Sequence, residues 1–153
     1  MLWRLDSGSH VATLVTIVCL AASPILLSFV IAIFAMPAYR PTEINPDVTL
    51  MISDLAWIGS MLIWPHLCVA MLMVGIIILK TQGRPESFPA WSGWVSIIAA
   101  AIEPFQGAIL FTKSGPLAPD GLLTWYAAVF SWGPWILLLS IAMLRILSRK
   151  REP

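Results

Sequence analysis

The residues of this chain that could carry chemistry lie in one apolar stretch. Glu103, Pro104 and Gln106 interrupt a hydrophobic segment that runs from about residue 91 to residue 111. A segment of this length can cross a membrane, so the sequence places Glu103 within the hydrocarbon. A charged side chain at the centre of a bilayer costs about 2.5–3.5 kcal/mol on insertion scales. We therefore expect Glu103 to face a bundle interior, a water-filled cavity or a partner protein.

His66 is the predicted partner of Glu103. If the helices that carry them cross the membrane in opposite directions, the two side chains differ by roughly 4–5 Å in depth, from the rise per residue of an α-helix. A carboxylate and an imidazole in contact could hold or transfer a proton, because each stabilises the charged form of the other. In the alternative interpretation, a neutral Glu103 hydrogen-bonds to Gln106 or to the backbone carbonyl that Pro104 leaves without its usual partner. His66 then packs in the core.

Metal-binding and catalytic motifs are absent from the sequence. His66 and Cys68 lie two residues apart, so they point to different faces of a helix, whereas ligands on one helix usually lie three or four residues apart. The chain also lacks an HExxH pattern, a nucleophile elbow and a phosphate-binding loop. We therefore expect no metal, no cofactor and no enzymatic activity.

Asp54 lies near the predicted outer end of the second apolar segment. At the start of a helix, its negative charge would complement the positive end of the helix dipole. We predict this helix-cap role. The alternative is a contact between Asp54 and a ligand or a cation at the outer face of the membrane.

Three tryptophans, Trp64, Trp132 and Trp135, fall near the middle of the predicted spans, whereas Trp57 and Trp125 fall near the outer boundary. Indole rings prefer the membrane–water interface, so the central tryptophans need another explanation. They could line a pocket for a flat apolar ligand, or a groove filled by a lipid tail or by a helix of another subunit. Packing within the bundle is the simplest alternative. The predicted ligand or proton site consists of Glu103, His66, Gln106, Trp64 and Trp132.

Four membrane-spanning helices are expected to position these side chains. Of the 153 residues, 59% are hydrophobic and 11% are charged, whereas a soluble domain has about 25% charged residues. Four apolar segments are long enough to cross the hydrocarbon, and each contains a proline near its middle: Pro24, Pro65, Pro104 and Pro134. The sequence thus predicts a single all-α membrane domain, a bundle of four transmembrane helices kinked at proline. The predicted spans are residues 11–36, 55–79, 90–111 and 122–147.

Basic residues are distributed unequally between the two sides of the predicted bundle. Seven of the nine Lys and Arg residues flank the termini or lie in the loop between the second and third spans, and only Arg40 and Lys113 lie on the other side. Positively charged flanks are retained in the cytoplasm. The sequence therefore predicts a multi-pass protein of the bacterial inner membrane with both termini cytoplasmic. Its net charge of +1 makes nucleic acid an unexpected partner.

Three stretches of the chain carry a resemblance to a known family: residues 53–57 (SDLAW), 88–94 (FPAWSGW) and 112–123 (TKSGPLAPDGLL). They resemble an uncharacterised family of multi-span bacterial membrane proteins that is common in actinobacteria. The family favours Arg where this chain has Ala90, and an aromatic-Ala-Trp-Asn sequence at residues 117–120. The resemblance covers residues 41–153 and implies no activity, because none is assigned to the family.

Two hypotheses of function follow from the sequence. Short loops and the lack of a complete active site favour a noncatalytic accessory or regulatory subunit that docks laterally on a larger integral membrane complex. An envelope lipid-transport machine is the expected setting, and membrane lipids are expected contacts. The alternative is a small proton-coupled carrier, or a binder of a hydrophobic ligand, that uses Glu103 and His66. A membrane enzyme acting on lipids would depend on these two side chains alone.

Overall fold

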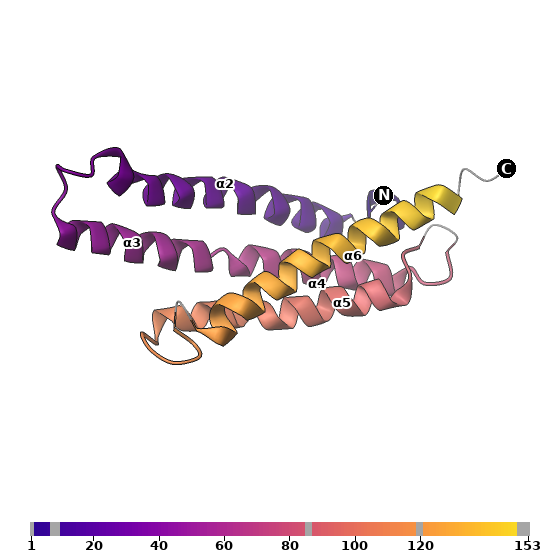
Figure 1. Cartoon of the computed structure of the whole chain (residues 1–153). Helices are drawn as coiled ribbons and strands as arrows, with labels where there is room; N and C mark the ends of the chain where they lie inside the picture. The colour runs from indigo at the N-terminus through magenta and orange to yellow at the C-terminus, as the bar shows by residue number, and fades with distance from the viewer. Residues whose placement is uncertain (1, 7–9, 85–86, 119–120, 150–153) are drawn as a thin grey trace.

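The computed structural model describes residues 2–6, 10–84, 87–118 and 121–149, and these residues form helices and loops without a strand among them. Four helical segments are long and apolar enough to cross a membrane, and they run up and down as a bundle (Figure 1). The predicted all-α fold of four membrane-spanning helices is therefore confirmed. The candidate spans are Val11–Tyr39, Pro46–Lys80, Ala90–Leu110 and Leu122–Ser148.

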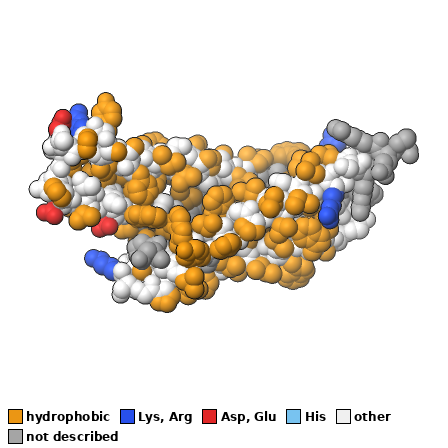
Figure 2. Space-filling model, in the orientation of Figure 1, with side chains coloured by type: hydrophobic (Ala, Val, Ile, Leu, Met, Phe, Trp, Pro, Cys, Tyr) orange, Lys and Arg blue, Asp and Glu red, His pale blue; other side chains and the backbone are white. Residues whose placement is uncertain are grey.

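The two ends of the bundle hold different loops. The helix α1 (Leu2–Leu5), the loop between α4 (Trp64–Lys80) and α5 (Ala90–Ile102), and the C-terminal end of α6 (Ala127–Arg149) lie at one end (Figure 1). The loops that follow α2 (Val11–Tyr39) and the third span lie at the other end. On the face shown in Figure 2, charged side chains lie toward the two ends and hydrophobic side chains cover the surface between them. An apolar band of this kind matches the hydrocarbon of a bilayer.

The second span is divided into two helices, α3 (Pro46–Met61) and α4, which are separated at Leu62 and Ile63. Pro65 lies in the first turn of α4. A proline is tolerated there, because the N–H groups of the first helical turn have no intrahelical partner. The predicted proline-linked interruption of this span is therefore observed.

Helix α3 begins at Pro46, well before residue 55, where the sequence predicts the span to begin. Asn45 caps the helix, since its side-chain oxygen accepts a hydrogen bond from the N–H of Asp47 at 2.9 Å. The first residue after the cap is proline, which suits this position. The helix thus extends beyond the predicted span at its N-terminal side, because the Asn-Pro pair sets the start of the helix and hydrophobicity does not.

The third span changes its helical form at Pro104. Helix α5 continues as a 3₁₀ helix, η1 (Glu103–Leu110), and the missing N–H of Pro104 leaves the carbonyl of Ala100 without its usual partner. The thiol of Cys68 in α4 donates a hydrogen bond to this carbonyl at 3.2 Å. A neighbouring helix thus satisfies the backbone group that proline frees, as the membrane interior requires.

Pro24 and Pro134, the other two mid-span prolines, lie within continuous helices. Pro24 and Pro37 are inside α2, and Pro134 is inside α6. In the last span the irregular part comes before α6, as a π-helical turn, η2 (Leu122–Tyr126). An interruption of the α-helix at a mid-span proline is therefore seen in the second and third spans only.

Helices α4 and α5 approach closely because each presents a glycine at their interface. A Cβ atom at Gly75 would lie 2.7 Å from Cγ1 of Ile97 and 2.9 Å from the carbonyl oxygen of Gly93. A Cβ atom at Gly93 would lie 2.9 Å from the Leu79 side chain. Small residues let membrane helices gain van der Waals contact that lipid cannot replace. The core around this contact includes Met71, Val74, Ile78, Ala99, Ala100 and Trp135.

The short helix α1 packs against one end of the bundle. Leu5 is buried in the core, and Nη1 of Arg84 donates a hydrogen bond to the Leu5 carbonyl at 2.9 Å. The carboxylate of Asp6 accepts hydrogen bonds from the N–H and the hydroxyl of Thr13 at 3.1 and 3.0 Å, in the first turn of α2. Helix α1 is thereby tied to α2 and to the α4–α5 loop.

Gly75→Ala is expected to destabilise the protein, because the added methyl group meets the backbone oxygen of Gly93. Overpacking of this kind lowers the free energy of unfolding by about 1–3 kcal/mol. Thermal unfolding in detergent micelles measures the effect. Gly133→Ala is the matched control, since a Cβ atom there meets nothing within 4 Å and alanine favours helix over glycine. Equal stability of the two variants would contradict the close packing of α4 on α5.

Candidate functional site

Glu103 lies at the centre of a buried polar cluster where α5 meets η1. Its side chain is 0% exposed. Nε2 of Gln106 donates a hydrogen bond to Oε2 of Glu103, and Oγ of Ser131 in α6 donates one to Oε1, both at 2.5 Å. Side chains three residues apart in a 3₁₀ helix lie on the same face, so η1 itself brings Gln106 to Glu103. The third span, through Gln106, and the last span, through Ser131, therefore each donate a hydrogen bond to one oxygen of the carboxyl group.

The partners of Glu103 are neutral. Among the residues that the structure describes, the single ion pair joins Arg40 and Glu43 at 3.5 Å, in the loop after α2. His66 forms no hydrogen bond or ion pair with Glu103, and its Nδ1 is buried without a partner in the described part of the chain. The described residues thus show no polar bond between the two side chains, since counting residues gives their depth but not the face of the helix on which each lies, and a joint proton site stays a prediction. The alternative, a hydrogen bond with Gln106, is observed.

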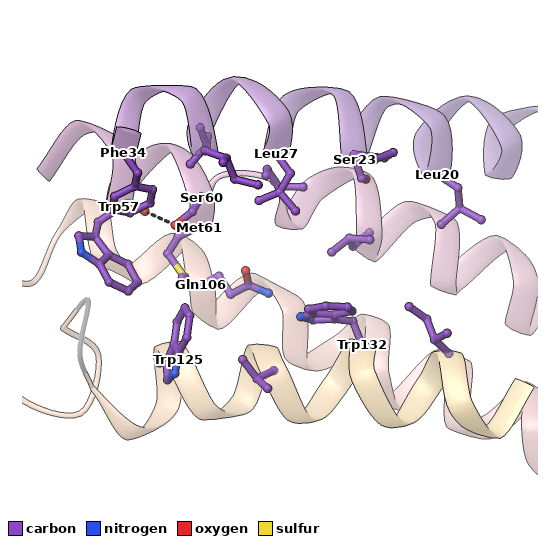
Figure 3. A pocket seen from close by; sticks show the side chains of 17 residues that line it. Leu20, Ser23, Leu27, Phe34, Trp57, Ser60, Met61, Gln106, Trp125 and Trp132 are labelled. Carbon is purple, nitrogen blue, oxygen red and sulfur yellow. Dashed lines mark hydrogen bonds between the residues drawn. The ribbon is translucent and has the colours of Figure 1, made fainter. Parts of the chain in front are cut away.

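An apolar cavity of about 480 Å³ lies beside this cluster, between the first and last spans (Figure 3). Helix α2 forms one wall, η2 and α6 form the opposite wall, and α3, α4 and η1 form the floor. Helix α2 packs against α3 and α4, whereas α6 packs against α5, η1 and η2, so α2 and α6 face each other across this space. The lining includes Leu27, Phe34, Trp57, Gln106, Trp125 and Trp132.

Gln106 connects the cavity with the buried carboxyl group. Ser23 and Ser60 also line the cavity, but their hydroxyls donate to the backbone carbonyls of Cys19 and Trp57, at 2.9 and 2.7 Å. The side chain of Gln106 is 5% exposed and donates one N–H to Glu103. A primary amide has a second N–H and a carbonyl oxygen. These two groups remain for a molecule in the cavity.

The structure separates the five predicted site residues into two groups. Gln106 and Trp132 line the cavity, and Glu103 lies behind Gln106. Trp64 packs instead against the backbone of η1, since a Cβ atom at Gly107 would lie 3.0 Å from its Nε1. His66 is also absent from the cavity lining. Glu103, Gln106 and Trp132 therefore form one site, and the other two residues are not part of it.

Asp54 lies inside α3, with its side chain exposed, and not at the start of a helix. The N-cap of this helix is Asn45. The helix-cap interpretation of Asp54 was therefore wrong, because the Asn-Pro pair starts the helix before the long apolar run begins. A contact of Asp54 with a ligand or cation at the surface stays a prediction.

Several residues of the site were missed in the sequence. Phe34 and Trp57 pack edge to face with ring centroids 5.5 Å apart, and Trp57 and Trp125 do so at 5.3 Å. Trp57 and Trp125 were predicted to lie near the membrane boundary and Phe34 was not singled out, whereas all three rings line the cavity. Ser131 was missed because a single serine in an apolar helix usually bonds to its own backbone. The available signal was that a carboxyl group within hydrocarbon requires donors from other helices.

The two irregular helical segments meet at this site. η1 packs against η2 as well as against α3, α4 and α6. Thr124 of η2 is fully buried, and its hydroxyl has no hydrogen-bond partner within the residues that the structure describes. Segments of 3₁₀ and π geometry inside longer helices often occur at functional sites. Within the described part of the chain, the Thr124 hydroxyl is therefore an unpaired polar group beside the site.

The chemistry that this arrangement offers is recognition. The cavity provides aliphatic and aromatic surface together with one amide whose orientation is fixed by a buried carboxyl group. Such a combination selects a ligand by shape and by one hydrogen-bonded group. Within the described ranges, no group of three or more His, Cys, Asp or Glu side chains could hold a metal ion.

Comparison with protein-family models, with curated proteins and with solved structures gives no match for this chain. The fold and the site together define its class: an α-helical protein with four candidate membrane spans, a buried carboxyl cluster and an apolar cavity between its first and last spans. The resemblance to the actinobacterial family stays a prediction.

Glu103→Leu is expected to destabilise the bundle, because the side-chain N–H of the buried Gln106 loses its acceptor. A buried polar group without a partner costs about 1–3 kcal/mol. Glu103→Gln keeps the shape and one acceptor oxygen, so its unfolding temperature in detergent should lie nearer to that of the wild type. Asp54→Asn, at an exposed position, controls for the loss of a carboxylate. If Glu103→Leu unfolds at the same temperature as Glu103→Gln, the cluster does not stabilise the fold.

Proposed function

We propose that this chain is a noncatalytic membrane protein that binds a hydrophobic ligand in the cavity between α2 and α6. The observation that carries the proposal is Gln106, whose amide lies in the lining of an apolar cavity and is oriented by the buried Glu103. Ligand sites are commonly apolar pockets of about 300–1,000 Å³ with a few placed polar groups. The cavity of about 480 Å³ has this size and this composition.

Binding is proposed in preference to proton-coupled transport. Proton-coupled transport needs a carboxyl group that exchanges its proton with water, whereas the side chain of Glu103 is fully buried and both of its oxygens accept hydrogen bonds, from Gln106 and Ser131. In this proposal Glu103 is a positioning residue: it orients Gln106 and does not touch the ligand. His66, outside the cavity lining, has no role in binding.

An accessory subunit of a larger membrane complex, with envelope lipid transport as its setting, is the second candidate. The outward face of α2 favours it, since only Thr13, Thr16, Ser23 and Val30 of this long helix are buried. An apolar surface of this extent suits lateral docking on another membrane protein. Extraction from native membranes at the natural expression level distinguishes the two candidates: recovery in fixed ratio with larger subunits favours docking, and recovery alone with a bound small molecule favours ligand binding.

We further propose that the protein lies in the inner membrane of a bacterium with both termini in the cytoplasm. Arg4, Lys80, Arg84 and Arg145 belong to the end of the bundle that carries α1 and the end of α6, whereas Arg40 and Lys113 belong to the opposite loops. Lys and Arg in short loops are retained on the cytoplasmic side.

Leu27→Trp is expected to abolish retention of the ligand, because Leu27 lines the cavity and the larger indole fills it. The matched control is Ile25→Trp on the same helix, at an exposed position outside the cavity lining. Native mass spectrometry of the protein, released from mild detergent, measures the bound mass. Equal loss of ligand from both variants, or a wild-type protein that carries no small molecule, would refute binding in this cavity.

Reporter fusions test the proposed orientation. A fluorescent protein fused to the C-terminus should fluoresce, and alkaline phosphatase inserted after Lys113 should be active, because phosphatase folds only outside the cytoplasm. Phosphatase inserted after Arg84 serves as the inactive control. The opposite pattern would place both termini outside the cell.

A further inference from the structure

We propose that the ligand of the α2–α6 cavity is an uncharged lipid that carries a hydroxyl group. Its hydroxyl lies at Gln106, and its hydrocarbon extends along the space between α2 and α6. This inference rests on the proposed binding function and specifies the chemistry of the ligand.

The lining of the cavity favours an uncharged ligand. None of the 17 residues that line it carries a charge. Glu103, the nearest ionisable group of the cluster, is 0% exposed and has both carboxyl oxygens bonded to Gln106 and Ser131. A phosphate, carboxylate or ammonium group in this cavity would be buried without a counter-charge, which is far more costly than burying a neutral polar group.

Gln106 and Trp132 together match a hydroxyl group. The hydrogen bond to Glu103 is the only one formed by the Gln106 side chain within the described residues, so its carbonyl oxygen and second N–H remain. In Figure 3 the Gln106 side chain extends into the cavity. The indole nitrogen of Trp132 lies on the side of its ring that faces Gln106. A hydroxyl can donate to the amide oxygen and accept from an N–H. An ether or a ketone cannot donate, and leaves a buried acceptor unsatisfied.

The space for hydrocarbon continues beyond this cavity. A second cavity of about 430 Å³ lies further along α2 and α6, lined by Ile17 and Leu20 on one side and by Leu139 and Met143 on the other. Leu20 lines both cavities. The distance along α6 from Trp132 to Met143 is roughly 16 Å at the rise of an α-helix. The two cavities thus lie one after the other along α2 and α6, and we infer that a long chain with its polar end at Gln106 extends past Leu20 from the first into the second.

Competition photolabelling of the full-length protein in nanodiscs tests the inference. The probe is a long-chain alcohol with a photoreactive diazirine in its chain, and the labelled peptides are identified by mass spectrometry. The competitors are 1-octadecanol, its methyl ether, octadecane and octadecanoic acid. We expect labelling of α2 and α6, and competition by the alcohol at about tenfold lower concentration than by the ether, the gain of one buried hydrogen bond.

Two variants locate the effect. Gln106→Met has a side chain of similar length without the amide, and it should make the alcohol and the ether compete equally. Trp132→Phe removes the indole N–H and keeps an aromatic ring, so it should reduce the preference for the alcohol. This variant provides the test if Gln106→Met does not fold. Ser28→Ala is the control, because Ser28 is exposed, does not line the cavity and bonds through its hydroxyl to a backbone carbonyl of its own helix.

Equal competition by alcohol and ether in the wild type, strongest competition by the acid, or a preference for the alcohol that survives both variants would overturn the hydroxyl assignment. In each of these cases labelling of α2 and α6 still supports a ligand site. Labelling that no competitor reduces, or that falls outside α2 and α6, overturns the binding function as well.

Discussion

A carboxyl group within hydrocarbon must obtain its hydrogen bonds from the protein that carries it, and much of this structure follows from that constraint at Glu103. The 3₁₀ geometry of η1 supplies Gln106 from the same span, and α6 supplies Ser131. The bond from Ser131 holds the last span against the third. Helix α6 therefore packs on α5, η1 and η2, while α2 packs on α3 and α4, and the space between α2 and α6 is left for the apolar cavity.

The half of the bundle that contains α4 and α5 is built more tightly than the half that contains the site. There Gly75 and Gly93 let the helix backbones approach, and Trp135 of α6 donates its indole N–H to Oγ of Ser96 at 2.9 Å. Ser96 in turn donates to the carbonyl of Ser92 at 2.8 Å. The hydroxyl groups of Ser92 and Ser96 in α5 thus bond to near neighbours. In the other half, by contrast, α5 and α6 are replaced by irregular segments, η1 and η2.

The sequence predicted the four spans well, because hydrophobic length is a strong and local signal. It also predicted that Glu103 and Gln106 could bond, since they lie three residues apart. It failed where the answer depends on the rotation of one helix against another. The depth of His66 relative to Glu103 did not determine whether they face each other, and nothing in the apolar pattern of α6 marked Ser131 as the third member of the cluster.

The start of α3 depends on a signal that the hydrophobic pattern does not contain. The cap at Asn45 is a local sequence signal, but it precedes the apolar run and so was not connected with it. The cavity between α2 and α6 could not be predicted at all, because it depends on which spans do not pack together. Trp57 and Trp125 were correctly expected near one end of the spans, yet their rings line this cavity, a property set by tertiary contacts.

The attachment of α1 affects how a molecule could reach the cavities. Leu2 and Trp3 line the second cavity at the end where Arg84 holds the Leu5 carbonyl, so α1 covers that end of the path between α2 and α6. The flanks of α2 and α6 face the surrounding apolar medium, so a ligand bound as we propose would enter sideways from the bilayer. Occupancy of such a site is governed by the mole fraction of ligand in the membrane and by lateral diffusion, not by its concentration in water. Low solubility of the ligand in water would therefore not limit its binding to this protein.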